Sequence, residues 1–216
     1  MTGDELASVA KAARAAGILV AVDVLHPGRP QDLERLAPLL AQAHWFLPND
    51  AQLLALTGRA ELADGMKDVL ALGTKGVAVT RGAAGCLIAS QDSGAPVNLP
   101  AIEVEVVDTT GCGDGFTAGL LAGLLAAPDP AEADPVDAAW LGLACGSLVA
   151  TGLGSDAGSR TSPRCWTSSS VRSRPWPAGS RSGSHDRAGH RRPAAKGARP
   201  SRDPGRDVRP PGGPGT

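Results

Sequence analysis

The last quarter of the 216-residue chain lacks the side chains that build a protein core. Residues 159–216 contain no leucine, isoleucine, phenylalanine, methionine or tyrosine, and no glutamate, glutamine or asparagine. They consist mainly of arginine, proline, serine, glycine and alanine. Such a segment cannot bury enough apolar surface to offset the conformational entropy lost on ordering. We therefore predict a disordered tail over residues 158–216, following a folded domain over residues 1–157.

The composition leaves two origins for the tail open. Residues 155–216 carry 13 lysines and arginines against 4 aspartates, a net charge of +9, which is typical of a nucleic-acid-binding tail. The same composition arises when a GC-rich gene is translated out of frame, and we favour this origin, with the change of frame near Gly158. Residues 1–154 carry a net charge of −10, so nucleic acid is not an expected partner of the folded part.

Other absences narrow the class of protein. The four cysteines form no Cys-x-x-Cys pair and no cluster with histidine, which argues against a zinc site or a disulfide framework. No apolar run is long enough to span a bilayer, and no basic, apolar signal segment follows Met1. We therefore expect a cytoplasmic protein that does not associate with membranes.

Segments typical of helices and of strands alternate along the front part. Amphipathic segments predict helices over residues 4–17, 31–43, 49–58, 61–73, 112–127 and 134–151. Apolar or β-branched runs predict strands over residues 18–24, 44–48, 76–82, 85–90 and 98–108, the third and fourth joined as a hairpin. This alternation predicts an α/β sandwich with a mainly parallel sheet. In such sheets ligands bind outside the carboxyl ends of the strands.

One predicted strand-to-helix junction contains residues suited to binding an anion and to catalysis. The string DTTGCGDGF, residues 108–116, places two glycines at the predicted start of a helix. The first N–H groups of a helix have no internal partner and lie at the positive end of its dipole, so they form an anion site. Gly111 and Gly113 allow the backbone to approach a phosphate group. A tight turn with Asp114 as an ordinary first-turn carboxylate is the alternative, but a carboxylate beside an anion site suits a general base for phosphoryl transfer.

This string resembles the second signature of the ribokinase/PfkB family of carbohydrate and nucleoside kinases. Three further segments agree with the family in order and spacing: DVLHPGR, FLPNDAQLLALTG and GVAVTRGAAGCLI. The resemblance covers residues 4–157. It implies a ribokinase-like three-layer αβα sandwich with a mainly parallel sheet, ATP and Mg²⁺ as cofactors, and a sugar, nucleoside or other sugar-like alcohol as the acceptor.

The resemblance also implies roles for single residues. Asp114 would be the catalytic base. The N–H groups of the anion hole would belong to Gly111, Cys112 and Gly113. The residues lining the ATP site would be Asn49, Thr80, Gly82 and Gly85. Two of these have simpler alternatives, because Asn49 also suits a helix N-cap and Thr80 also suits the end of a strand.

Two cation sites are implied in the same way. Asn49 matches the start of the family's Asn-x-x-Glu motif, which helps to order Mg²⁺. Gln52 stands in the place of the glutamate and lacks its charge, so we expect weaker Mg²⁺ organisation. Asp108 and Thr110 match a loop that holds a monovalent cation such as K⁺ in many members. Asp23, at the end of a predicted strand, is a further candidate for contacts with substrate or cation.

The family's N-terminal half, with its Gly-Gly signature and β-lid, has no counterpart in this sequence. We therefore expect a C-terminal catalytic half, and the activity of the chain by itself is in doubt. The leading function is ATP-dependent phosphorylation of a sugar-like hydroxyl. The alternative is a non-catalytic fragment that retains an ATP-like pocket.

Overall fold

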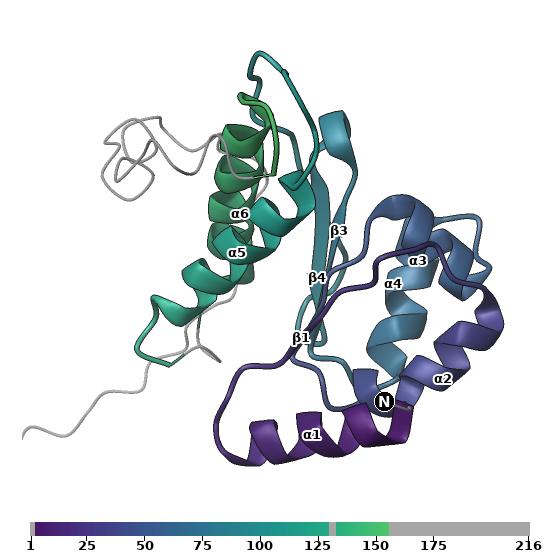
Figure 1. Ribbon diagram of the computed structural model, residues 1–216. Coiled ribbons are helices and arrows are strands. Elements are labelled where there is room, and N and C mark those ends of the chain that lie inside the picture. Colours follow the sequence, from purple (N-terminus) through teal and green to yellow (C-terminus); the bar gives the residue numbers. More distant parts are fainter. Residues whose placement is uncertain (1–2, 130–132, 156–216) are drawn as a thin grey trace, which may run out of the picture. The chain divides into compact units, whose positions relative to one another are not determined.

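The computed structural model describes residues 3–129 and 133–155, which form a five-stranded sheet with helices on both faces (Figure 1). These residues belong to one compact unit. The predicted tail, and the domain boundary at residues 157 and 158, lie outside the described residues. None of the helices in the described part is long and apolar enough to cross a membrane.

The sheet is mixed. Its strands, in spatial order, are β1 (Ala21–Val22), β2 (Trp45–Phe46), β3 (Gly76–Thr80), β4 (Cys86–Ser90) and β5 (Val97–Leu99). Strands β1, β2 and β3 pair in parallel, whereas β3–β4 and β4–β5 pair antiparallel. The predicted hairpin is confirmed as β3–β4, in which Thr80 pairs with Cys86. The hairpin and β5 supply the antiparallel pairings, so the parallel part is limited to three strands.

The helices agree closely with the predicted segments. They are α1 (Gly3–Ala15), α2 (Pro30–Leu40), α3 (Asp50–Thr57), α4 (Leu62–Ala71), α5 (Cys112–Leu125) and α6 (Pro135–Ala150). Three strand predictions were clearly too long: those for β1 and β2, each of which has two residues, and that for β5, which ends at Leu99. Strand β1 keeps two of seven predicted residues, because it pairs only with β2 among the described strands. After Leu99 the chain leaves the sheet, and Val107 N–H donates to the carbonyl of Ala150 at the end of α6.

The two-residue period of the strands divides the core into two clusters, one on each face of the sheet. Val77 and Val79 face one cluster, and Ala78 between them faces the other. The first cluster packs against α2, α3 and α4 and includes Leu40, Phe46, Leu53, Leu56, Met66 and Val69. The second packs against α5 and α6 and includes Trp45, Ile88, Phe116, Leu120, Leu124 and Leu143. Figure 1 shows these two sets of helices on opposite sides of the strands.

Helices α5 and α6 pack backbone against backbone. A methyl group at Gly119 would lie 2.6 Å from the carbonyl oxygen of Leu141 and 2.8 Å from the Cα of Gly142. In return, a methyl group at Gly142 would lie 2.9 Å from the carbonyl oxygen of Phe116. One turn after Gly119, a methyl group at Gly123 would lie 2.7 Å from the Cα of Ala138; one turn before it, a methyl group at Gly115 would lie 2.9 Å from a side-chain methyl of Val149. This glycine seam (residues 115, 119 and 123 of α5 against α6) fixes the spacing of the two helices.

A carboxylate ties the loop before α5 to the loop after α6. Asp108 Oδ2 accepts a hydrogen bond from the N–H of Gly154 at 3.0 Å. Its Oδ1 accepts from the N–H and the hydroxyl of Thr110, at 3.0 and 2.8 Å. These bonds, the Thr110 N–H first and the Gly154 N–H second, hold the pKa of Asp108 below its ordinary value of 3.8. Both loops are therefore fixed at the same end of the α5–α6 pair.

We expect Gly119→Ala to lower the free energy of unfolding by roughly 1–3 kcal/mol, because the methyl group would meet backbone atoms that cannot rotate away. This loss exceeds the gain of about 1 kcal/mol in helix propensity. The measurement is urea denaturation of the full chain. The matched control is Gly113→Ala in the same helix, where a methyl group has no neighbour within 4 Å. Equal stability of Gly119→Ala and the control would contradict the close packing.

The lowered pKa of Asp108 predicts a pH-dependent contribution to stability. A carboxyl group whose pKa is lower in the folded state stabilises the protein above its unfolded pKa and loses this effect as pH falls through the folded pKa. We expect Asp108→Asn to be less stable than the wild type by a constant amount from about pH 7 to pH 5, and the difference to shrink below about pH 4. Urea midpoints at a series of pH values test this. A difference that grows on acidification would argue against it.

Candidate functional site

The N-terminus of α5 presents unpaired N–H groups. Gly111 precedes the helix in the left-handed conformation (φ 79°), and a side chain there would meet Ser155, 2.6 Å from its carbonyl oxygen. The N–H of Cys112 donates to the carbonyl of Thr109 at 3.2 Å. Within the described residues no acceptor meets the N–H groups of Gly111, Gly113 or Asp114. Of the three predicted anion-hole residues, Cys112 therefore uses its N–H in the turn, whereas Gly111 and Gly113 keep theirs free among the described residues. Asp114, which was not predicted to belong to the anion hole, also has a free N–H group.

Two carboxylates lie at this end of the sheet. Asp114 is exposed in the first turn of α5. Asp23 directly follows β1, and its Oδ1 accepts a hydrogen bond from Val24 N–H at 2.6 Å. The pKa of Asp23 is raised, mainly because its carboxyl group is partly desolvated; the Val24 bond opposes this shift and the negative charge of Asp114 adds to it. The carboxyl end of β1 and the start of α5 are therefore close enough for their charges to interact.

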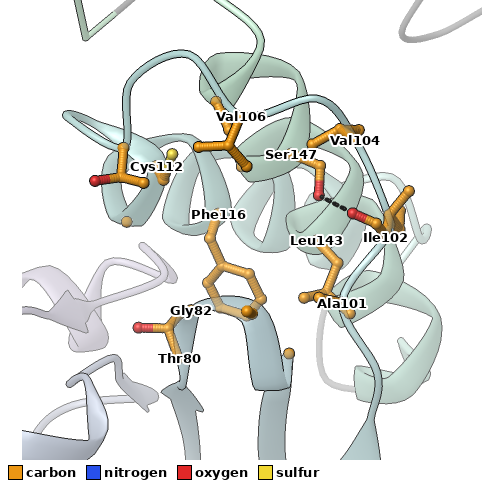
Figure 2. Close-up of a pocket in the computed structure, with 16 residues that line it drawn as sticks. Thr80, Gly82, Ala101, Ile102, Val104, Val106, Cys112, Phe116, Leu143 and Ser147 are labelled. Carbon is orange, nitrogen blue, oxygen red and sulfur yellow. Dashed lines mark hydrogen bonds between the residues drawn. The ribbon is translucent and has the colours of Figure 1, made fainter.

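A cavity of about 480 Å³ adjoins the start of α5. Figure 2 shows its walls, with the ring of Phe116 directed from α5 toward the hairpin turn at Gly82. Among the described residues that line it, none has a charged side chain. Its lining residues are Thr80, Gly82, Ala83, Gly85, Ala101, Ile102, Val104, Val106, Thr109, Cys112, Gly113, Phe116, Leu143, Gly146, Ser147 and Ala150. Partial burial, then the charge of Asp108, raises the pKa of the Cys112 thiol, so this thiol is not an activated nucleophile.

The β3–β4 hairpin contributes one wall and is fixed in turn by its neighbours. Gly85 adopts a positive φ of 83°, and a side chain there would collide with the backbone at Leu99. Arg81 donates to the side chain of Asn98, on strand β5. On the other side, Thr80 N–H donates to the carbonyl of Pro48 at 3.1 Å, and Thr80 forms a parallel bridge with Asn49. The hairpin turn is thus held between β5 and the start of α3.

The start of α3 is capped by two of the predicted site residues. Asn49 Oδ1 accepts from the N–H of Gln52 at 2.8 Å, and Gln52 Oε1 accepts from the N–H of Asn49 at 2.7 Å. This reciprocal pair is a capping box. The N-cap role foreseen for Asn49 is present, and the bridge to Thr80 places it beside the hairpin as well.

The structure brings some of the predicted residues together at the cavity; Asn49, Gln52, Gly111 and Asp114 do not line it. Those that line the cavity are Thr80, Gly82, Gly85, Cys112 and Gly113. Asp108 and Thr110 bond to each other at the loop before α5. Sequence reasoning missed the far wall of the cavity, which is formed by residues 101–106 and by Leu143, Gly146, Ser147 and Ala150 of α6. Their spacing of three to four residues along one helix face was visible, but an apolar helix gives no sign of which face lines a cavity.

Comparison with known proteins shows the family to which the chain belongs. Residues 2–162 match the model of the pfkB family of carbohydrate kinases. The 1-phosphofructokinase of Haloferax volcanii is 35% identical over 125 residues, which are 56% of this chain and 38% of that protein.

Solved structures agree with this match. Aminoimidazole riboside kinase from Salmonella enterica, in complex with aminoimidazole riboside and an ATP analogue, is 31% identical, with a TM-score of 0.60 over 69% of this chain and 51% of that one. A fructokinase double mutant from Vibrio cholerae, bound to fructose, ADP and a potassium ion, is 26% identical, with a TM-score of 0.60 over 68% of this chain and 49% of that one.

The chain therefore spans about half or less of the length of these relatives. The likenesses confirm the predicted ribokinase-like α/β fold. The chain belongs to the pfkB family of carbohydrate kinases.

Proposed function

We propose that the protein takes part in ATP-dependent phosphorylation of a hydroxyl group on a sugar or nucleoside. The observation that carries this proposal is the position of the free N–H groups at the start of α5, directly beside the apolar cavity. A nucleotide needs both features, an apolar slot for its base and hydrogen-bond donors for its phosphates. Family membership supports the same activity.

The cavity is the proposed nucleotide site. Its apolar walls, Phe116 and Leu143 among them, suit the flat face of a purine base. Thr80, Gly82 and Gly85 bring the hairpin backbone to one side of the bound nucleotide. The N–H groups of Gly113 and Asp114 then point toward the phosphates, where the positive end of α5 stabilises the charge on the transferring group.

Asp114 is the proposed base. Its carboxylate is exposed and lies in the same helical turn as the free N–H groups. A hydroxyl bound between Asp114 and the terminal phosphate would donate its proton to the carboxylate as it attacks phosphorus. The carboxylate therefore takes up the proton while the helix N-terminus stabilises the phosphoryl oxygens.

The residues present are compatible with the expected cations. Among the described residues no three acidic, histidine or cysteine side chains cluster to form a metal cage. Mg²⁺ at kinase sites needs no such cage, because it is held by phosphate oxygens, water and one or two carboxylates, and there it neutralises phosphate charge. For K⁺ we propose the two loops that Asp108 joins. The potassium ion in the Vibrio cholerae fructokinase supports the use of K⁺.

A second candidate is nucleotide binding without transfer. The part of the chain that the structure describes brings no charged side chain to the cavity, and the polar side chains that it brings are two threonines, one serine and one thiol. A sugar acceptor requires several polar partners, since its hydroxyl groups lose water on binding. The lining therefore favours a nucleotide over an acceptor, and the chain covers only half of the relatives that bind both.

We expect the full chain to bind a fluorescent ATP analogue in this cavity and Ser147→Phe to weaken that binding at least about tenfold, equivalent to about 1.4 kcal/mol. The aromatic ring would occupy the space next to Ile102, whose carbonyl now accepts from Ser147 at 3.4 Å. The control is Ser8→Phe on α1, where the hydroxyl of an exposed serine likewise donates to a backbone carbonyl, that of Asp4. Equal affinity in both variants would exclude the cavity as the binding site.

The second test concerns transfer. Purified chain is incubated with Mg·ATP, K⁺ and a panel of ribose, fructose, hexose phosphates and nucleosides, and ADP release is measured. We expect Asp114→Asn to reduce acceptor-dependent release by about 10²–10⁴-fold while leaving ATP binding nearly unchanged. Asp64→Asn, another exposed first-turn carboxylate, is the control. Retained turnover in Asp114→Asn would disprove its role. ATP binding without any acceptor-dependent release would support the second candidate.

A further inference from the structure

We propose that Gln52 is a positioning residue, whose side-chain amide ties the carboxyl end of β1 to the start of α3 and so fixes the loop that carries Asp23. The inference is independent of the proposed function. It assigns to Gln52 a task different from the weak Mg²⁺ contact implied by the family motif.

The contact joins two segments 28 residues apart in the sequence. Gln52 is 7% exposed. Its Nε2 donates to the carbonyl of Val24 at 2.5 Å, and its Oε1 accepts from the N–H of Asn49 at 2.7 Å. Both polar atoms of the side chain are therefore engaged by the backbone. One partner requires a donor and the other an acceptor, so the pattern fixes the orientation of the amide.

This pattern requires an amide of this length. An ionised glutamate offers only acceptors, so it could still accept from Asn49 but would face the carbonyl of Val24 with a negative charge. Methionine fills the same volume without either bond. The Gln52 position therefore cannot take the family's usual carboxylate without leaving a carbonyl unpaired, which costs more than an ordinary hydrogen bond contributes.

The segment that Gln52 contacts lies beyond the hydrogen bonds that join β1 to the sheet. Strand β1 ends at Val22, whose carbonyl accepts the last bond from β2, given by Leu47 N–H at 2.9 Å. Beyond it, both backbone polar groups of Val24 are hydrogen-bonded: its carbonyl accepts from Gln52, and its N–H donates to the carboxylate of Asp23. Gln52 thus acts on Asp23 through a single intervening residue.

Hydrogen–deuterium exchange of the full chain without nucleotide tests the proposal. In Gln52→Glu, we expect exchange in peptides covering residues 18–26 to rise at least about tenfold, because one buried bond is lost locally. Peptides covering residues 49–57 and β3 should keep their protection, because the carboxylate still caps α3. Unchanged exchange over residues 18–26, or an equal rise in β3, would overturn the proposal, since the second pattern marks only global destabilisation.

Two additions make the result decisive. Gln52→Met lacks the cap as well, so exchange should rise in residues 18–26 and 49–57 together, and this variant decides the matter if Gln52→Glu does not fold. Binding of a fluorescent ATP analogue is also measured against Mg²⁺ concentration in the wild type and in Gln52→Met. Weaker Mg²⁺ dependence in Gln52→Met with unchanged exchange over residues 18–26 would overturn the proposal, because the Gln52 amide would then act on the metal and not on the end of β1. The exchange result needs no nucleotide, so a failure of ATP binding would count only against the proposed function.

Discussion

The close backbone contact between α5 and α6 is the constraint on which the candidate site depends. Because glycines form the seam, the helices approach until backbone atoms meet at Gly119 and Gly123, and this contact sets their spacing. The start of α5 and the end of α6 therefore have fixed positions. Asp108 can reach Gly154, and Gly111 can lie against Ser155. One wall of the cavity is built from this pair of helices.

Much of the fold could be predicted from the sequence because its signals are local. The helices have apolar periodicity and clear ends, such as Asn49 before α3 and Gly58 after it. The hairpin was recognisable from the glycines between its strands. The length of β1 was not predictable, because β-branched residues such as Ile18 and Val24 favour a strand while pairing depends on neighbours distant in sequence. The strand predicted beyond Leu99 was wrong for the same reason, since the N–H of Val107 bonds to the carbonyl of Ala150 at the end of α6 and not to another strand.

The candidate site, like the fold, was only partly predictable from the sequence. The glycines and Asp114 follow from chemistry that one short string contains, namely a strand end, a helix start and a carboxylate. The use of the Cys112 N–H in a turn is a matter of local geometry that composition does not specify. The partner of Gln52 lies 28 residues upstream, so the sequence shows an altered motif but not the bond that makes the amide necessary. The distant wall of the cavity was likewise invisible, because small and apolar residues are common in any helix.

The glycines of the seam also affect the order in which the protein can assemble. Helix α5 contains four glycines, at residues 113, 115, 119 and 123, each of which weakens an isolated helix by about 1 kcal/mol relative to alanine. A 14-residue helix of this composition is unstable in water until a partner covers it. Helix α5 therefore becomes stable only when the sheet face and α6, which together cover it, are in place. The free N–H groups at its start are then among the last features of the described fold to form.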